Sequence, residues 1–153
     1  MADARFVGTL QLAAGQVEDQ HVSTSTKIDS DKLQHCYRAG TNFNTAIGGT
    51  PVTREEIVFV CEVAGTIRGF SALCNDTGTA ASVTFDLKKN GTTILSSVIT
   101  ITNATADRAV IDGTLSATSV AVGDVLSIAL TVSTSTGMQG PYAYVTIEEN
   151  GAP

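Results

Sequence analysis

The alternation of apolar and polar residues is clearest in Ser82–Ile101. Val83, Phe85 and Leu87 are separated by single polar residues, which is the period-two pattern of a half-buried strand. Asn90-Gly91 follows at once, and this dipeptide supplies the two positive-φ residues that a type I′ turn requires. A second β-rich run comes directly after the turn. The segment therefore predicts a β-hairpin.

Further β-type segments flank this hairpin. The almost continuously apolar run Ile57–Val63 predicts a strand buried on both faces. Leu126–Ser133 and Tyr142–Glu148 alternate in the strand pattern. Residue composition predicts a turn at Asn75–Gly78 and a break at Gly137–Pro141. Weaker β signals lie at Arg5–Leu12, Thr66–Cys74, Arg108–Gly113 and Ala117–Val122.

Together these signals predict an all-β chain. About seven or eight strands follow one another between residues 57 and 148, with turn signals roughly every 8–12 residues. No helical run separates them, which argues against a parallel α/β sheet. We expect an antiparallel β-sandwich of jelly-roll-like type.

Residues 1–54 have a different character and predict an extended N-terminal arm, with the sandwich at 55–153. The arm is polar, and its apolar residues Val17, Val22, Ile28 and Leu33 are too far apart to form a core face. Because long structureless loops are uncommon inside compact domains, we expect the arm to lie on a neighbouring subunit, with these four residues as contacts. The alternative is a long cover over one end of its own sandwich.

Charge and composition narrow the function classes. The formal net charge is −6 at pH 7 and only 16% of the 153 residues are charged. An acidic surface repels phosphate backbones, which argues against nucleic-acid binding. No long apolar run predicts a membrane segment, and no secretory signal is expected from the first residues. Three cysteines without close spacing argue against a disulfide framework.

Residue types that could support metal or catalytic chemistry are scattered. His21, His35 and Cys36 do not have the spacing of a zinc site, and no Gly-x-Ser-x-Gly elbow accompanies the two histidines. Five aspartates near predicted strand ends could gather Ca²⁺, but ordinary turn chemistry is the favoured explanation; they are Asp76, Asp86, Asp107, Asp112 and Asp124. We expect no catalytic residue, no metal and no cofactor.

Two aromatic residues are the sequence's candidates for ligand contact. Tyr142 and Tyr144 share one face of the last predicted strand. Exposed rings in such a position could form a carbohydrate platform. They could equally serve as anchors at a subunit interface, where tyrosine is common.

The second half of the chain resembles β-sandwich modules of tailed-bacteriophage virion proteins, particularly capsid decoration (cement) proteins and head or tail fibre domains. The residues that carry this resemblance are Ala64–Ile67, Val83–Ile94 and Val122–Ile128, and Val22–His35 is similar to the N-terminal arms of such proteins. The motifs are structural: a Lys-Asn-Gly-Thr hairpin and a Gly-Asp turn. The absence of a repetitive stalk favours a small decoration protein over a fibre.

The resemblance implies a homotrimer that stabilises a phage capsid by bridging neighbouring copies of the major capsid protein. Such a protein would be made in the host cytoplasm and sit on the capsid surface. Two alternatives stay open at this point. One is a fibre or receptor-binding head domain, and the other is a carbohydrate-binding module that uses Tyr142 and Tyr144.

Overall fold

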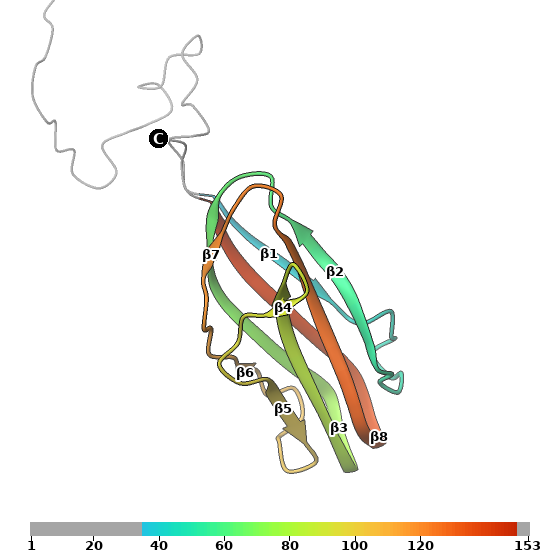
Figure 1. Ribbon diagram of the computed structural model, residues 1–153. Coiled ribbons are helices and arrows are strands. Elements are labelled where there is room, and N and C mark those ends of the chain that lie inside the picture. The colour runs from blue at the N-terminus through green and yellow to red at the C-terminus, as the bar shows by residue number, and fades with distance from the viewer. Residues whose placement is uncertain (1–34, 150–153) are drawn as a thin grey trace, which may run out of the picture.

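A computed structural model describes residues 35–149, and this part of the chain contains eight β-strands and no helix (Figure 1). None of the described residues forms an apolar helix long enough to cross a membrane. The strands are β1 (Cys36–Thr41), β2 (Arg54–Val60), β3 (Gly65–Lys89), β4 (Thr92–Thr93), β5 (Ile99–Thr102), β6 (Ile111–Asp112), β7 (Ser119–Val120) and β8 (Val125–Glu149).

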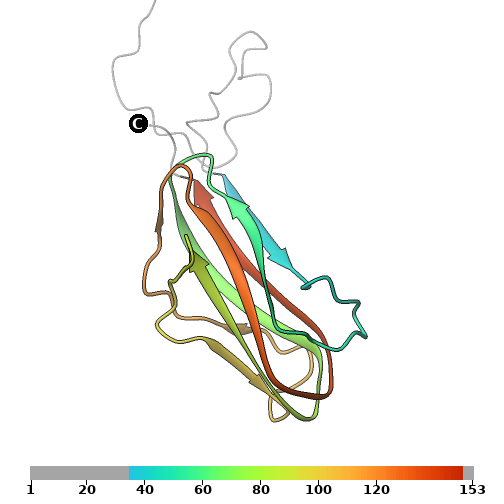
Figure 2. The same ribbon diagram turned by 45° about the vertical axis from the view of Figure 1, so that its right-hand side comes forward.

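Two 25-residue strands, β3 and β8, form the centre of the structure. They pair antiparallel along their whole length, from Gly65 opposite Glu149 to Lys89 opposite Leu126. The paired ribbon folds back on itself at mid-length, so that each strand runs through both layers (Figures 1 and 2). Gly78 and Gly137 lie at this bend with φ angles of +71° and +76°, values that L-residues with side chains rarely adopt.

The predicted turn at Asn75–Gly78 and the predicted break at Gly137–Pro141 are therefore wrong as strand ends. Both segments continue their strands through the bend, where the register shifts between Thr77 and Ala80. Glycines in such a strand provide a bulge and a sharp fold without ending the hydrogen-bond ladder. Composition alone cannot distinguish such a bend from a turn between two separate strands.

The remaining strands complete two layers. One layer holds β1, the second half of β8, the first half of β3, and the short β6 and β7. The other layer holds β2, the first half of β8, the second half of β3, and β4 and β5. All pairings are antiparallel. The prediction of an all-β, sandwich-like fold is confirmed.

The alternating segments place their apolar residues in the core as predicted. Val83, Phe85 and Leu87 are fully buried, and the turn that follows has φ angles of +51° at Asn90 and +80° at Gly91. Alternating buried residues of β8 face them or extend the same core: Leu126, Ile128, Leu130, Ala143, Val145 and Ile147.

The strand predicted at Ile57–Val63 is present over Ile57–Val60, but its predicted burial on both faces is wrong. The strand ends at Val60 and pairs with β8 on one side, so it is an edge strand among the described residues. Ile57 and Val60 are 70% and 52% exposed. A continuous apolar run indicates burial on both faces only when neighbours cover both, and a register shift between Ile57 and Phe59 changes which side chains face inward.

The predicted arm, residues 1–54, includes residues that the structure places in the sandwich. Cys36–Thr41 is strand β1 and pairs with β8, and Phe43 is 1% exposed within the core. Residues 36–54 thus belong to the sandwich. Val17, Val22, Ile28 and Leu33, proposed as arm contacts, lie outside the described residues, as does the predicted strand at Arg5–Leu12.

Candidate functional site

Tyr142 and Tyr144 lie side by side on the outer face of β8. Their ring centroids are 6.0 Å apart at an interplanar angle of 37°, and Ala143 between them is fully buried. The guanidinium of Arg38, on the neighbouring strand β1, lies 4.6 Å from the centroid of the Tyr144 ring, within cation–π distance. The shared face predicted for the two tyrosines is therefore present.

The absence of a side chain at Gly40 leaves room for Tyr142 and Tyr144. A Cβ atom at this position would lie 2.8 Å from the Tyr142 hydroxyl oxygen and 2.9 Å from the Tyr144 Cβ. The side chain of Tyr142 consequently reaches over the backbone of β1. A larger residue at position 40 would also meet the Ala143 carbonyl oxygen at 2.7 Å, so both the Tyr142 side chain and the backbone of β8 would have to shift.

A pocket of about 520 Å³ lies beside Tyr142. It is built where four segments meet: the β1–β2 loop, the middle of β3, the β5–β6 loop and the bend of β8. Its lining residues are Asn42, Thr45, Ile47, Leu73, Asn75, Arg108, Gly140, Pro141 and Tyr142.

The lining combines an apolar surface with a few polar groups. Ile47, Leu73 and Pro141 supply aliphatic carbon, and Tyr142 is 36% exposed. The lining side chains carry two amides, two hydroxyls and one guanidinium, and none of them carries a carboxylate. A largely apolar cavity with few convergent polar groups is typical of a small-ligand site.

The β1–β2 loop is held to the sandwich by Phe43. Phe43 and Asn44 have φ angles of +54° and +52°, which are uncommon for residues with side chains. The Phe43 ring nevertheless packs into the core against Phe85, with centroids 5.8 Å apart. Burial of a phenyl ring contributes about 1.5–3 kcal/mol, enough to offset a strained backbone of about 1–3 kcal/mol.

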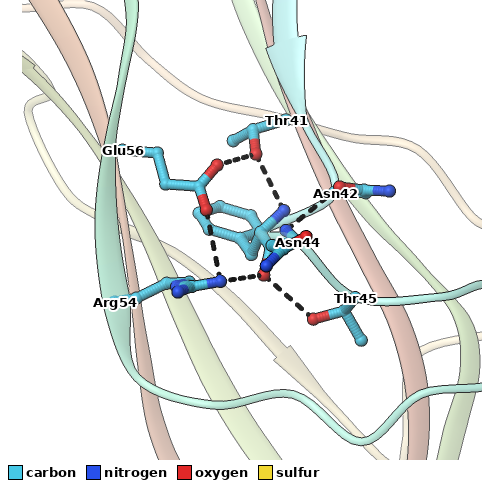
Figure 3. A network of polar contacts seen from close by, with 7 residues as sticks. Thr41, Asn42, Asn44, Thr45, Arg54 and Glu56 are labelled. Atoms are coloured by element: carbon cyan, nitrogen blue, oxygen red, sulfur yellow. Dashed lines mark hydrogen bonds and ion pairs between the residues drawn. The ribbon is translucent and has the colours of Figure 1, made fainter.

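A polar network around Phe43 fixes the loop further (Figure 3). The Phe43 N–H donates to Thr41 Oγ1 at 2.8 Å, and the Thr41 hydroxyl donates to the Glu56 carboxylate. Arg54 Nη1 donates to the Phe43 carbonyl at 2.8 Å and lies 3.4 Å from Glu56. The network thus ties the loop to β2.

The same network positions two lining residues of the pocket. The Thr45 hydroxyl donates to the Phe43 carbonyl at 3.1 Å, and Asn42 Oδ1 accepts from the Asn44 N–H at 3.1 Å (Figure 3). Asn42 and Thr45 are therefore attached to a buried anchor although both belong to a loop.

Gly140 joins the loop to the bend of β8. Its N–H donates to the Gly49 carbonyl at 3.0 Å, and its φ angle is +57°. A Cβ atom at this position would collide with the Ile47 carbonyl oxygen and lie 2.9 Å from the Asn75 Cβ. Glycine is thus required for the close approach of the loop that forms the pocket wall.

Arg108 enters the pocket from the β5–β6 loop with a φ angle of +58°. Its N–H donates to the Cys74 carbonyl at 2.9 Å, and its Nε donates to Asn75 Oδ1 at 3.0 Å. These bonds fix both the backbone and the guanidinium of Arg108 against β3. The predicted strand Arg108–Gly113 is accordingly shorter than expected, because only Ile111–Asp112 pairs with β3.

The sequence identified one pocket residue, Tyr142, and its neighbour Tyr144. It missed Asn42, Asn75 and Arg108, since Asn42 falls in the predicted arm and the others were assigned to a turn and a strand. These residues come together through the pairing of β3 with β8 and through loop contacts to β3, and the sequence does not give the register of that pairing.

The other candidate groups do not converge. No cluster of three or more His, Cys, Asp or Glu side chains suitable for a metal occurs among residues 35–149; His21 lies outside that range. Asp76 accepts from the Gly78 N–H, and Asp112 accepts from the Ser71 hydroxyl. Asp124 accepts from the Ala121 N–H. Asp76 and Asp124 thus have the local hydrogen bonds of ordinary turn residues, and Asp112 bonds across its strand pair with β3.

Comparison with known proteins does not show a family for this chain. No family model matches the chain, and no curated protein matches it. Among solved structures, it has some similarity to the EclA C-terminal domain, a sugar-binding protein, at 13% identity over 74% of this chain and 78% of that chain. The TM-score is 0.37, which is too low to indicate a shared fold or a shared function.

Proposed function

We propose that this protein is a non-catalytic β-sandwich binding module whose pocket beside Tyr142 binds a saccharide. The observation that carries the proposal is the composition of that pocket. A partly exposed tyrosine ring lies next to two amides, a hydroxyl and a guanidinium.

These groups complement the chemistry of a sugar. A pyranose has C–H faces, which pack on an aromatic ring or an aliphatic wall, and hydroxyls that both donate and accept hydrogen bonds. Tyr142 and Leu73 would contact such a face. Asn42 and Asn75 each carry an amide donor and an amide acceptor, so either can serve a sugar hydroxyl.

Two contacts hold the walls of the pocket in place. Phe43 anchors one wall in the core, and Gly140 holds the loop against β8. A preformed site loses less conformational entropy when the ligand binds than a mobile loop would. Weak individual hydrogen bonds to sugar hydroxyls would then suffice for useful affinity.

A glycan array with purified wild-type protein, Tyr142→Ala and Tyr37→Ala tests this function. Tyr37 is a matched control because it is a similarly exposed tyrosine, 40% against 36%, and is not among the lining residues. We expect wild type and Tyr37→Ala to bind the same glycans, and Tyr142→Ala to lose at least tenfold in affinity. Equal binding by Tyr142→Ala and wild type would refute the assignment of the pocket.

A second candidate is the structural role in a phage virion that the sequence resemblance implies. The observation that favours it is the apolar surface at strand β2, where Ile57 and Val60 are exposed on an edge of the sandwich. Exposed apolar edge strands are prone to pair with another chain. We propose a second copy of this protein as the occupant, in the trimer that the resemblance suggests.

Light scattering on the size-exclusion peak tests this second role. The expected result is a mass of three chains that falls to one in Ile57→Lys, with an unchanged circular dichroism spectrum. A wild-type monomer of 15.8 kDa at tens of micromolar would contradict it. Bridging of the major capsid protein stays a prediction, to be tested by cryo-EM of purified particles.

A further inference from the structure

The pocket and the protein as a whole carry charge of opposite sign. The chain has a formal net charge of −6, yet the pocket lining includes Arg108 and no Asp or Glu. A local positive group in an acidic protein is not explained by solubility. The pocket therefore presents a positive group, without a carboxylate in its lining, to whatever binds there.

The guanidinium of Arg108 has N–H donors that make no hydrogen bond to the described residues. Its Nε bonds to Asn75 Oδ1 at 3.0 Å, and among the described residues neither of its Nη groups has a hydrogen-bond partner. None of the ion pairs formed by residues 35–149 includes Arg108. The Nη groups are thus available to a ligand while Nε holds the plane of the guanidinium.

The nearest acidic side chain in sequence, Asp107, is engaged elsewhere. Its Oδ1 accepts from the Thr77 N–H and from the Thr77 hydroxyl, both at 2.9 Å. These hydrogen bonds, with a smaller contribution from the charge of Arg108, hold the pKa of the Asp107 carboxyl below its usual value. Asp107 is therefore anionic but committed to Thr77.

We infer that the saccharide bound by this pocket is acidic and presents a carboxylate, as a uronic acid does, to Arg108. This inference rests on the proposed function. A planar guanidinium binds a planar carboxylate through two parallel N–H···O bonds, a geometry that a neutral hydroxyl cannot supply. The Tyr142 ring would contact the sugar ring, and Arg108 would select its charge.

Isothermal titration calorimetry with defined oligosaccharides tests the inference. The probes are oligogalacturonides as the acidic series and malto-oligosaccharides and cello-oligosaccharides as neutral series, with poly-L-glutamate as a non-sugar polyanion. The variants are Arg108→Gln and Tyr142→Ala, with Arg68→Gln as a control for net charge, since Arg68 pairs with Glu148 and does not line the pocket.

We expect wild type and Arg68→Gln to bind the acidic series at least tenfold more tightly than the neutral series, and more weakly at high salt. Arg108→Gln should abolish that difference, and Tyr142→Ala should weaken both series. Equal binding of acidic and neutral sugars by wild type would overturn the inference but leave the proposed function standing. Binding of poly-L-glutamate as tight as that of the sugars, or no sugar binding at all, would overturn both.

Discussion

The rings of Phe43 and Phe85 pack together in the core with centroids 5.8 Å apart, which joins the β1–β2 loop to the central ribbon. Truncation of Phe43 to Ala should therefore cost about 3–5 kcal/mol of unfolding free energy, as should truncation of Phe85. Urea denaturation followed by circular dichroism measures both. Thr84→Ala, on the opposite face of β3, is the control and should change stability by less than about 1 kcal/mol. A change that small for Phe43→Ala would mean that the loop is not part of the core.

Deletion of N-terminal residues tests whether the core needs β1 and Phe43. Removal of residues 1–50 deletes β1 and Phe43, so we expect the cooperative melt to be lost. A chain that begins at residue 35 keeps every described strand and serves as the control. A cooperative melt without residues 1–50 would show that the sandwich does not need β1.

Gly78 should be more sensitive to substitution than Gly91, although both have positive φ angles of +71° and +80°. An alanine in this conformation costs about 1–2 kcal/mol from its backbone alone. At Gly91 nothing lies within 4 Å of an added Cβ, whereas at Gly78 the Cβ would collide with the Thr136 carbonyl oxygen. Thermal melts of the two alanine variants should show the larger loss for Gly78→Ala. Equal losses would indicate that the bend of the ribbon can relax.

Stability should fall in acid partly through Asp124. Its carboxylate accepts from the Ala121 N–H at 2.8 Å and from the Asn90 amide at 2.7 Å. These bonds, with Lys89 nearby, lower its pKa from the ordinary 3.8. Because the folded-state pKa lies below the unfolded value, Asp124 stabilises the fold above about pH 4 and loses this effect as the pH falls through the folded-state pKa.

Melting temperatures of wild type and Asp124→Asn between pH 2 and pH 7 check this sign. The curve of the variant should be flatter below pH 4, and the two proteins should differ most near neutral pH. Parallel curves over the whole range would mean that the Asp124 bonds make no net contribution.

The three cysteines should differ in reactivity. Cys36 is exposed, whereas Cys61 and Cys74 are buried, and burial raises the pKa of Cys74 to about 12 and that of Cys61 above its usual value. Since the thiolate is the reactive form, a thiol-disulfide reagent at pH 8 should label one thiol rapidly in the folded protein. All three should react in denaturant. Rapid labelling of two or three thiols without denaturant would contradict the burial of Cys61 and Cys74.

Sequence patterns predicted the β class and the central hairpin because local rules decide both. Val83, Phe85 and Leu87 alternate, and Asn90-Gly91 can adopt the turn with little strain. The bend of β3 and β8 could not be predicted in this way, since Gly78 and Gly137 look like turn residues. Their role depends on how the two strands pair over a distance of many residues.

The candidate site was predictable only in part for the same reason. Tyr142 was identified from its position on the polar face of the last strand. Asn75 lies near it only because β3 pairs with β8. Arg108 does so only because its loop bonds to Cys74 of β3, and Asn42 only because Phe43 anchors its loop. Residues brought together by long-range pairing leave no local pattern in the sequence.

A ¹⁵N NMR titration with a saccharide that the protein binds tests the central claim most directly. If the pocket beside Tyr142 is the site, the largest shifts should map to its lining, including the side-chain amides of Asn42 and Asn75, the Arg108 Nε–H and the Tyr142 backbone. Resonances of Ile57 and Val60, which lie on strand β2 and do not line the pocket, should stay unchanged. Shifts confined to that edge, or spread over the surface without a maximum at the pocket, would contradict the account.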